Sequence, residues 1–355
     1  MADRIYLDHA STTPILPEAA AAIRAACEAW ANPSSAHAEG RAVRAAMEEA
    51  RRRLGAALGW DGTLIFTSGA TEAIDIVLRR ARAGAPIVSA IEHPAVLRSA
   101  GGEARQIAVR SDGTLDLDDL DAALAGSERP LVAVQAVNNE TGVIHPLEAI
   151  AAAVRAAGGL LLADCAQSAG KLPLPDADFI VVAAHKLGGP PGVGALLVRD
   201  PATLEAVGGQ EGGFRPGTAP VPLIMGFAAA AEADHGWYEE SRRLRARLDA
   251  AIAEAGGEVV AGAAPRIATI SAYRMPAVPA AAQMMQLDLA GIAVSAGSAC
   301  SSGSLKTSHV LLAMGMEEEA AREVIRISFG PRTSESEIDA LLGEWRKLYE
   351  RRHAA

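Results

Sequence analysis

The sequence predicts an α/β protein, with a large domain built on a mostly parallel seven-stranded sheet and a smaller α+β domain. The first reason is that short apolar runs alternate with helical patterns from about residue 64 to residue 198. This alternation is typical of parallel strands that are buried under helices on both faces. The second reason is that the pattern of predicted elements changes after about residue 219, where long helical patterns accompany two strand candidates. The length of 355 residues is sufficient for two domains.

The expected elements follow from these apolar patterns. The seven strands of the sheet are expected at 64–67, 86–90, 106–109, 131–137, 160–163, 179–184 and 195–198. Helices of the same part are expected at 17–30, 39–58, 71–82 and 147–157. The later part is expected to hold helices at 222–233, 238–255, 280–290 and 335–351 and strands at 266–272 and 324–329. We expect a large domain of residues 13–240 and a small domain of residues 1–12 and 241–355.

Composition and charge narrow the class of protein. Half of the residues are hydrophobic and the formal net charge is −10, which argues against binding to nucleic acid or to an anionic membrane. The N-terminal stretch lacks the basic start and apolar core of a secretory signal. The alanine-rich run at 149–169 contains charged residues, so it does not resemble a membrane span. We therefore expect a cytoplasmic enzyme.

The three cysteines lie far apart in the sequence and differ in their surroundings. Their spacing predicts neither a disulfide framework nor a Cys-x-x-Cys metal site, and no metal is expected. Cys27 falls in a helical pattern and Cys165 follows a buried strand, so both are expected to be packing residues. Cys300 is flanked by small residues in SAGSACSSGS, which favours an exposed thiol that needs a neighbouring acid or base for reactivity.

The strand ends are where the sequence places its chemistry, because ligands of open parallel sheets bind outside the carboxyl ends of the strands. Residues 68–71 turn the first strand into a helix whose N-terminus favours an anion such as phosphate, although a simple helix cap is the alternative. Asp164 and Lys186 end two strands that follow each other in the sequence. Each alone would more often be a cap, an ion pair or a solvated turn residue. Together with the anion cradle they predict bound pyridoxal phosphate, with Lys186 as its Schiff base and Asp164 at the ring nitrogen.

Other polar residues gain meaning only beside this set. His93 follows a strand, where an imidazole is placed to stack on a ring or move protons, and His185 adjoins the lysine. Asn139 lies at another strand end, where a turn is the alternative. Arg326 lies among apolar residues and must meet a carboxylate, either in an ion pair or on an amino-acid substrate. A dinucleotide site is disfavoured, because the glycines of GGPPGVG precede a strand and not a helix.

The chain resembles the cysteine desulfurases, which are fold-type I pyridoxal phosphate enzymes related to class V aminotransferases. The matching motifs cover nearly the whole chain in the family's order: YLDHASTTP, NPSSAH, FTSGATEA, EHPAV, NNETG, ADCAQSAGK, HKLGGPPGVGAL, RPGTAP, SAGSACSSGS and IRISFG. The occurrence of the SAC segment together with the lysine motif HKLGGPPGVGAL is specific for this family. The chain resembles the group whose catalytic cysteine lies on a long loop, which here belongs to the small domain.

The resemblance implies roles for the matched positions. The expected catalytic residues are Lys186, Cys300 as the nucleophile, and His93 for proton transfer at sulfur. The expected cofactor-binding residues are Ala70, Thr71, His93, Asn139, Asp164, Gln167, His185, Lys186 and Thr218. Thr218 is expected to reach the phosphate from the second subunit of a homodimer.

The resemblance also implies the reaction. L-Cysteine, held through its carboxylate by Asn139 and Arg326, is converted to L-alanine while its sulfur passes to Cys300 as a persulfide. The persulfide is then delivered to an acceptor protein for iron–sulfur cluster or other sulfur-cofactor assembly. Two alternatives stay open. Another pyridoxal phosphate reaction, such as β-elimination, selenocysteine lysis or aminotransfer, would not need Cys300, and a non-catalytic interaction protein would not need Lys186 or Asp164.

Three departures from the family pattern stand out. Ala183 occupies a position that is usually serine, which removes one phosphate donor, and Gly212 stands where an arginine is common. The sequence ends soon after its last helical pattern, whereas members that serve an iron–sulfur scaffold often carry a longer tail. These departures leave the sulfur acceptor open.

Overall fold

The computed structural model describes residues 4–29, 31–234, 236–297 and 306–353. Its main sheet has seven strands in the order β2-β8-β7-β6-β5-β3-β4. Their bounds are Thr63–Thr67 (β2), Gly194–Val198 (β8), Phe179–Ala183 (β7), Leu160–Asp164 (β6), Leu131–Gln135 (β5), Pro86–Ser89 (β3) and Arg105–Ile107 (β4). Only β8 runs antiparallel to its neighbours β2 and β7. The predicted seven-stranded, mostly parallel sheet is therefore confirmed, with strand ends that differ from the expected ones by two residues at most.

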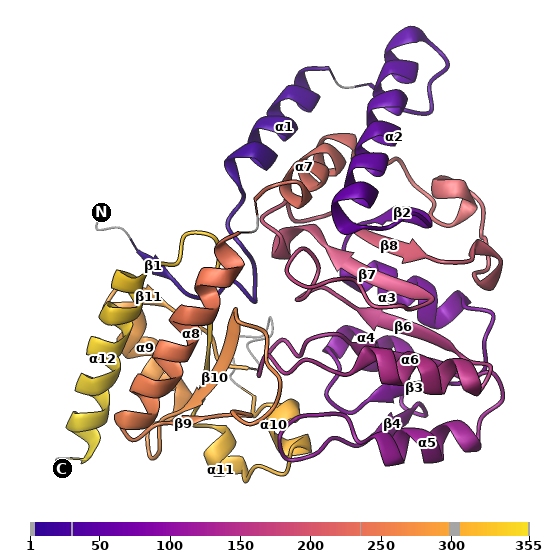
Figure 1. Cartoon of the computed structure of the whole chain (residues 1–355). Coiled ribbons are helices and arrows are strands. Elements are labelled where there is room, and N and C mark those ends of the chain that lie inside the picture. Colours follow the sequence, from indigo (N-terminus) through magenta and orange to yellow (C-terminus); the bar gives the residue numbers. More distant parts are fainter. Residues whose placement is uncertain (1–3, 30, 235, 298–305, 354–355) are drawn as a thin grey trace.

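Helices cover both faces of this sheet because successive strand residues point to opposite sides. On one face, Val132 and Val134 of β5 pack with helices α2 (Ala38–Leu58), α5 (Leu117–Ala125), α6 (Leu147–Ala156) and α7 (Val221–Ala231). On the other face, Leu131 and Ala133 pack with α3 (Ala70–Arg80) and α4 (Pro94–Ala100). Figure 1 shows α5 and α6 on the opposite side of the sheet from α3 and α4. Both faces are apolar, which explains the continuous apolar runs in the sequence.

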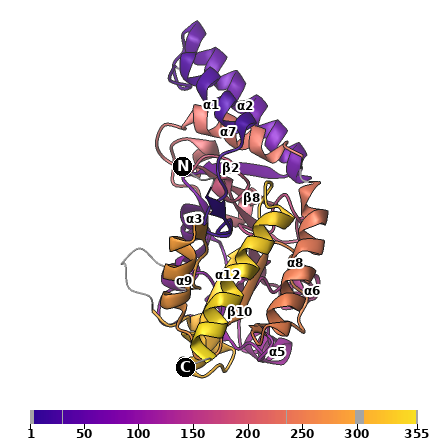
Figure 2. The same cartoon turned by 90° about the vertical axis from the view of Figure 1, so that its left-hand side faces the viewer.

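A second, smaller part of the molecule, called the small layer below, follows α7 in the sequence. An antiparallel sheet, β12-β10-β9, contains Val324–Ser328, Ile270–Arg274 and Glu258–Val259. Helices α8 (Trp237–Glu254), α9 (Ala280–Leu289) and α12 (Glu335–His353) share a core with this sheet, around Tyr273 and Trp345. Two short helices, α10 (His309–Ala313) and α11 (Glu318–Ala321), lie before β12. Figure 2 shows α8, α9 and α12 toward the opposite end of the molecule from α1 and α2.

One expected strand is displaced. The strand expected at 266–272 begins at Ile270 as β10, because the chain before it pairs elsewhere. Arg266 forms a bridge with Val143, and the N–H of Ile267 donates to the carbonyl of Gly142 at 2.8 Å. These residues therefore pair with the segment between β5 and α6 instead of extending β10.

The N-terminus links the two parts of the molecule. Strand β1 (Ile5–Tyr6) pairs in parallel with β11 (Ile292–Ala293), and Leu7 is buried in the same core as Trp345. The chain then crosses to α1 (Pro17–Glu28), which packs against α7 beside the main sheet (Figure 1). This stretch, residues 7–16, is called the crossing segment below. It lies where both parts of the molecule meet.

Two further sequence expectations meet different outcomes. Cys165 is fully buried, as expected of a packing residue. The expectation for Cys27 is wrong, since its side chain is exposed on α1; a helical pattern with many alanines does not fix which face is covered. Within the described residues, no helix is long and apolar enough to cross a membrane.

Candidate active site

Lys186 lies just past the end of β7, in the short 3-10 turn Ala184–Lys186. Its Nζ donates to the backbone carbonyl of Ala10. Burial, followed by the charges of Arg326 and Lys171, lowers the pKa of Lys186 to about 7, although the carboxylates of Asp164 and Asp8 oppose the shift. A large share of the amine is therefore uncharged at neutral pH, which is the form that attacks a carbonyl carbon.

The glycines that follow Lys186 are required by close approaches of the backbone. Gly188 has φ +83°, and a Cβ there would lie 2.6 Å from Leu16 Cγ. Gly194 begins β8, and a Cβ there would lie 2.8 Å from the Cα of Gly69. The second contact brings the turn before α3 against the end of β7, because Gly194 pairs with Ala183. A larger residue at either position would push the lysine turn away from its neighbours.

Asp164 is the last residue of β6, directly beside β7 in the sheet. It is only 8% exposed, and its Oδ1 accepts a hydrogen bond from the N–H of Ala166 at 2.9 Å. Burial raises the pKa of Asp164, while the Ala166 bond and the charges of His93 and Lys186 act in the opposite direction. A buried carboxylate in this position is stabilised by a cation such as a protonated ring nitrogen.

The two histidines differ in protonation and contacts. His93 caps α4, with its Nδ1 accepting from the N–H of Ala95 at 3.1 Å, so the neutral ring carries its proton on Nε2. Burial of the ring lowers the pKa of His93, and the charge of Asp164 opposes that shift. The Nδ1 of His185 lies 3.2 Å from Thr12 Oγ1, and burial together with the charge of Lys186 lowers its pKa to about 4. Both rings are therefore mainly neutral at pH 7.

The start of α3 has the backbone features that the predicted anion site requires. The cap residue Gly69 has φ +152° and no side chain to accept from the first-turn N–H groups. Ala70 and Thr71 form the first turn, and Thr71 is exposed. Exposed first-turn N–H groups and the helix dipole favour a phosphate here.

Gln167, Asn139 and Arg326 gather around the crossing segment of the N-terminus. Gln167 Nε2 donates to the Ala10 carbonyl at 2.9 Å, and its buried Oε1 has no partner among the described residues. Arg326 is 5% exposed and donates to Asp8 Oδ1 at 2.8 Å and to the carbonyl of Asn139 at 2.9 Å. The expected ion pair of Arg326 is thus present, with Asp8 as the partner.

Two expected site residues are not joined to this group. Thr218 is exposed in the segment between Glu211–Gly213 and α7, and no hydrogen bond within the described part of the chain links it to the other candidates. Cys300 lies outside the described residues.

The residues that sequence reasoning missed belong mostly to the crossing segment. The Ala10 carbonyl accepts from both Lys186 and Gln167, and the hydroxyl of Thr13 donates to the Lys186 carbonyl at 3.2 Å. Lys171 was also missed. A backbone carbonyl carries no residue-type signal, so only the position of YLDHASTTP as a matched motif pointed to this segment.

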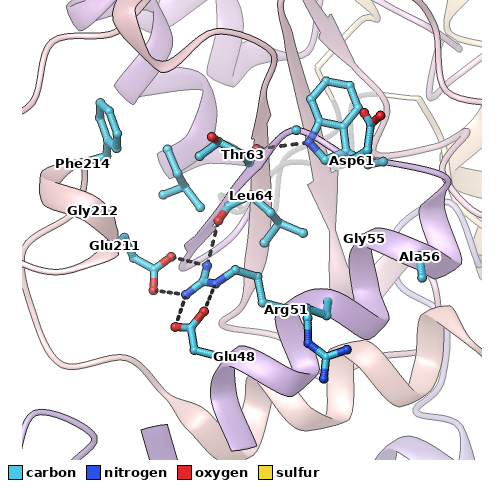
Figure 3. A pocket seen from close by; sticks show the side chains of 14 residues that line it. Glu48, Arg51, Gly55, Ala56, Asp61, Thr63, Leu64, Glu211, Gly212 and Phe214 are labelled. Carbon is cyan, nitrogen blue, oxygen red and sulfur yellow. Dashed lines mark hydrogen bonds and ion pairs between the residues drawn. The ribbon is translucent and has the colours of Figure 1, made fainter. Parts of the chain in front are cut away.

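Two cavities lie near different parts of the sheet. The larger, of about 600 Å³, lies between α2, β2 and the turn Glu211–Gly213, and Lys186 does not line it (Figure 3). The smaller, of about 290 Å³, is lined by Lys186 and Lys171. We call the smaller one the lysine cavity; its lining residues are Thr13, Leu16, Pro17, Glu18, Lys171, Lys186, Leu187, Ala233, Asp234, Trp237, Pro331 and Arg332.

Comparisons with known proteins agree with this arrangement. The family model "Aminotransferase class-V" matches residues 5–341. A cysteine desulfurase of Cereibacter sphaeroides is 37% identical over 368 residues, covering 96% of this chain and 94% of the relative. This chain belongs to the cysteine desulfurases of the class-V aminotransferase family. A NifS-like protein from Rickettsia africae has a similar structure, with a TM-score of 0.90, 29% identity and coverage of 98% and 100% of the two chains.

A second similar structure is described as containing cysteine. The structure described as SspA in complex with cysteine has a TM-score of 0.79 and 28% identity, and covers 93% of this chain and 100% of its own. The cysteine desulfurases, including this chain, depend on pyridoxal phosphate. The predicted family, fold and cofactor are therefore confirmed.

The residues present fit pyridoxal phosphate. The uncapped first turn of α3 suits its phosphate. The buried carboxylate of Asp164 suits its ring nitrogen, and the unpartnered buried side-chain oxygen of Gln167 marks a polar position where a ligand group would complete the hydrogen bonding.

Proposed function

We propose that this chain converts L-cysteine to L-alanine and transfers the sulfur to Cys300. The observation that carries the proposal is the Lys186 amine, which is kept largely uncharged at neutral pH beside the buried Asp164. The overall exchange balances: L-cysteine and the Cys300 thiol give L-alanine and the Cys300 persulfide. The similarity to cysteine desulfurases and to a structure containing cysteine supports this substrate.

The side chains around Lys186 divide the work. When bound, pyridoxal phosphate supplies an aldehyde carbon for covalent attachment and a ring that accepts electrons from the substrate. Lys186 would hold the cofactor between turnovers and remove the α-proton of the substrate. Asp164 would keep the ring nitrogen protonated, and Ala70, Thr71 and His185 would hold the phosphate. His93 would stack on the ring and move protons at sulfur through Nε2.

The substrate carboxylate would bind at Arg326 and Asn139. Arg326 already donates to Asp8 and to Ser11 Oγ, at 2.8 Å and 2.6 Å, so its side chain is fixed before substrate arrives. A second carboxylate must share the guanidinium with Asp8. The ion pair with Asp8 and the substrate contact would therefore exist together on one guanidinium and are not exclusive alternatives.

We further propose the setting in which this reaction occurs. The active form would be a homodimer in which Thr218 of each chain reaches the other chain's cofactor, together with Gln167 and Asn139 of the chain that holds it. A large domain of residues 13–240 and a small domain of residues 1–12 and 241–355 fit the division of the buried cores between the two layers. The persulfide would be delivered to an acceptor protein in the cytoplasm, for iron–sulfur cluster or other sulfur-cofactor assembly.

The proposal is tested by three proteins under one assay. With L-cysteine and a thiol reductant, the unchanged protein should release alanine and sulfide in equal amounts. Cys300→Ser should keep the spectral response to L-cysteine but form no persulfide. Lys186→Ala should hold no cofactor that borohydride can fix to the protein. If the Cys300→Ser protein released alanine and sulfide at the unchanged rate, a reaction without Cys300 would replace this proposal; if it released pyruvate, β-elimination would.

A further inference from the structure

A second lysine lies beside the catalytic one without a role in the reaction described above. Lys171 follows β6 by a turn and lines the lysine cavity together with Lys186. Its Nζ donates to the carbonyl of Gln167 at 3.1 Å, which is its only hydrogen-bond or ion-pair partner within the described residues. A partly buried cation with no carboxylate bonded to it among the described residues carries a desolvation cost.

Hydrogen bonds connect the two lysines. Lys171 Nζ donates to the Gln167 carbonyl, and the Gln167 side chain donates to the Ala10 carbonyl at 2.9 Å. The Ala10 carbonyl also accepts from Lys186 Nζ. Lys171 is thus linked to the Lys186 amine through Gln167 and the backbone carbonyls of Gln167 and Ala10.

We propose that Lys171 is a positioning residue for the Schiff-base chemistry: its positive charge holds the neighbouring amine of Lys186 in the uncharged form that captures an aldehyde. This inference rests on the proposed role of Lys186. It adds a residue to which neither the family resemblance nor the sequence patterns assigned a task. Placing a second cation near a nucleophilic lysine is a general way to favour its uncharged form.

Burial and Arg326 lower the pKa of Lys186 more than Lys171 does, but Lys171 is the cation among them to which no carboxylate is bonded within the described residues. Arg326 also repels a proton on Lys186, but it is paired with Asp8 at 2.8 Å, and the Asp8 charge acts in the opposite direction. Asp164 attracts the proton. His185, next in the chain, and His93, near Asp164, both have lowered pKa values and are mainly neutral at pH 7.

The protonation of Lys171 itself fits this role. Burial lowers the pKa of Lys171 to about 8, whereas that of Lys186 is about 7. Lys171 therefore keeps its charge over the range in which Lys186 loses its proton. The same charge also reaches the buried His9, whose pKa is lowered to about 4 by burial and then by Lys171. Glu18 and Asp234 line the same cavity but are exposed to solvent, which screens their opposing charges.

Three variants separate charge from hydrogen bonding. Lys171→Met removes both, Lys171→Gln keeps a donor for the Gln167 carbonyl without the charge, and Lys171→Arg keeps both. The cofactor-free proteins are labelled with trace acetic anhydride from about pH 6 to 9, and the labelling of Lys186 is measured by peptide mass spectrometry. The exposed Lys347 is the internal reference for reagent activity in each sample.

The Met and Gln variants should shift the labelling midpoint of Lys186 upward by about one pH unit, and the Arg variant should match the unchanged protein. At pH 7 that shift lowers the labelling rate about fivefold. Covalent capture of pyridoxal phosphate by the cofactor-free protein should move to higher pH in the same way.

Three results would overturn the inference: an unchanged Lys186 profile in Lys171→Met, a Gln variant that behaves like the unchanged protein, or an Arg variant that shifts like Met. Should the Met variant not fold, the Gln variant decides alone. The labelling reports the amine without cysteine, so it remains valid even where the proposed desulfurase activity fails.

Discussion

At the residue scale, the amine of Lys186 couples reactivity to a cost in stability. Its pKa is about 7 in the folded chain and near 10.5 in an unfolded one. Between these values the unfolded state binds more protons, so the unfolding free energy rises with pH in that window. The cost is fully present below about pH 7 and disappears near pH 10.5.

We predict that Lys186→Met stabilises the cofactor-free protein at neutral pH by about 1–3 kcal/mol, after screening and loss of the bond to Ala10 are allowed for. The advantage should shrink steadily toward about pH 10. Urea unfolding at three pH values measures it, with the exposed Lys347→Met as the control. An advantage that is constant with pH would mean that the charge of Lys186 is not the cause.

Ala183 supports a second prediction at this scale. It is 1% exposed and lies two residues after Val181, so it points to the same face of β7, the face that α3 covers. A hydroxyl there would point toward the cradle at the start of α3. Because charge-assisted hydrogen bonds contribute roughly 1.5–3 kcal/mol, Ala183→Ser should slow loss of pyridoxal phosphate on dialysis, with a gain in affinity of up to about tenfold. Equal or faster loss would show that position 183 does not face the phosphate.

At the scale of elements, the exposed edge of the main sheet is closed by an ion pair. Glu211 accepts from the N–H of Phe66 at 2.8 Å, and Arg51 donates to the Leu64 carbonyl at 2.7 Å and to Glu211 at 2.7 Å. Figure 3 shows Arg51 between Glu48, Glu211 and the strand. These two side chains take the place of a neighbouring strand on β2. They also fasten the turn that precedes Thr218.

We predict that Glu211→Ala lowers the unfolding free energy by about 2–4 kcal/mol, because it leaves the buried N–H of Phe66 without its acceptor and removes one of the two carboxylates that bind Arg51. The side chain of Glu211 is 2% exposed. The matched control is Glu232→Ala, which breaks the Arg53 pair whose side chains are both 37% exposed and should cost less than about 1 kcal/mol. Urea unfolding compares the two. Equal losses would contradict the edge-closing role.

At the scale of the whole molecule, the candidate site is assembled from segments far apart in the sequence. The crossing segment supplies Ala10 and Asp8, the main sheet supplies Asp164 and Lys186, and the small layer supplies Arg326. Thr218 is a cofactor-binding candidate that is exposed and has no hydrogen bond to this group within the described part of the chain. A second copy of the chain is the source that the proposed dimer provides.

We predict that two inactive variants restore each other. Lys186→Ala lacks the amine, and Thr218→Asp places a negative charge against the phosphate. Co-expressed chains with different affinity tags yield mixed dimers, in which one site carries both changes and the other carries neither. Such dimers should show about half of the unchanged activity. If each Thr218 served its own chain, every site would carry one change and no activity would return.

The sequence by itself determined the sheet, most helices and the residues at the strand ends. Continuous apolar runs that alternate with helices predict parallel strands buried on both faces. Asp164 and Lys186 follow neighbouring strands, β6 and β7, so they lie at the same edge of the sheet. Tertiary structure alone decided three matters. Arg266 pairs with Val143 instead of extending β10, and Cys27 faces solvent. The Lys171 and Lys186 amines share a cavity and a backbone carbonyl network. These three features depend on which groups lie close in space and on how far water is excluded from them. Neither property can be deduced from the residues that are neighbours in the sequence.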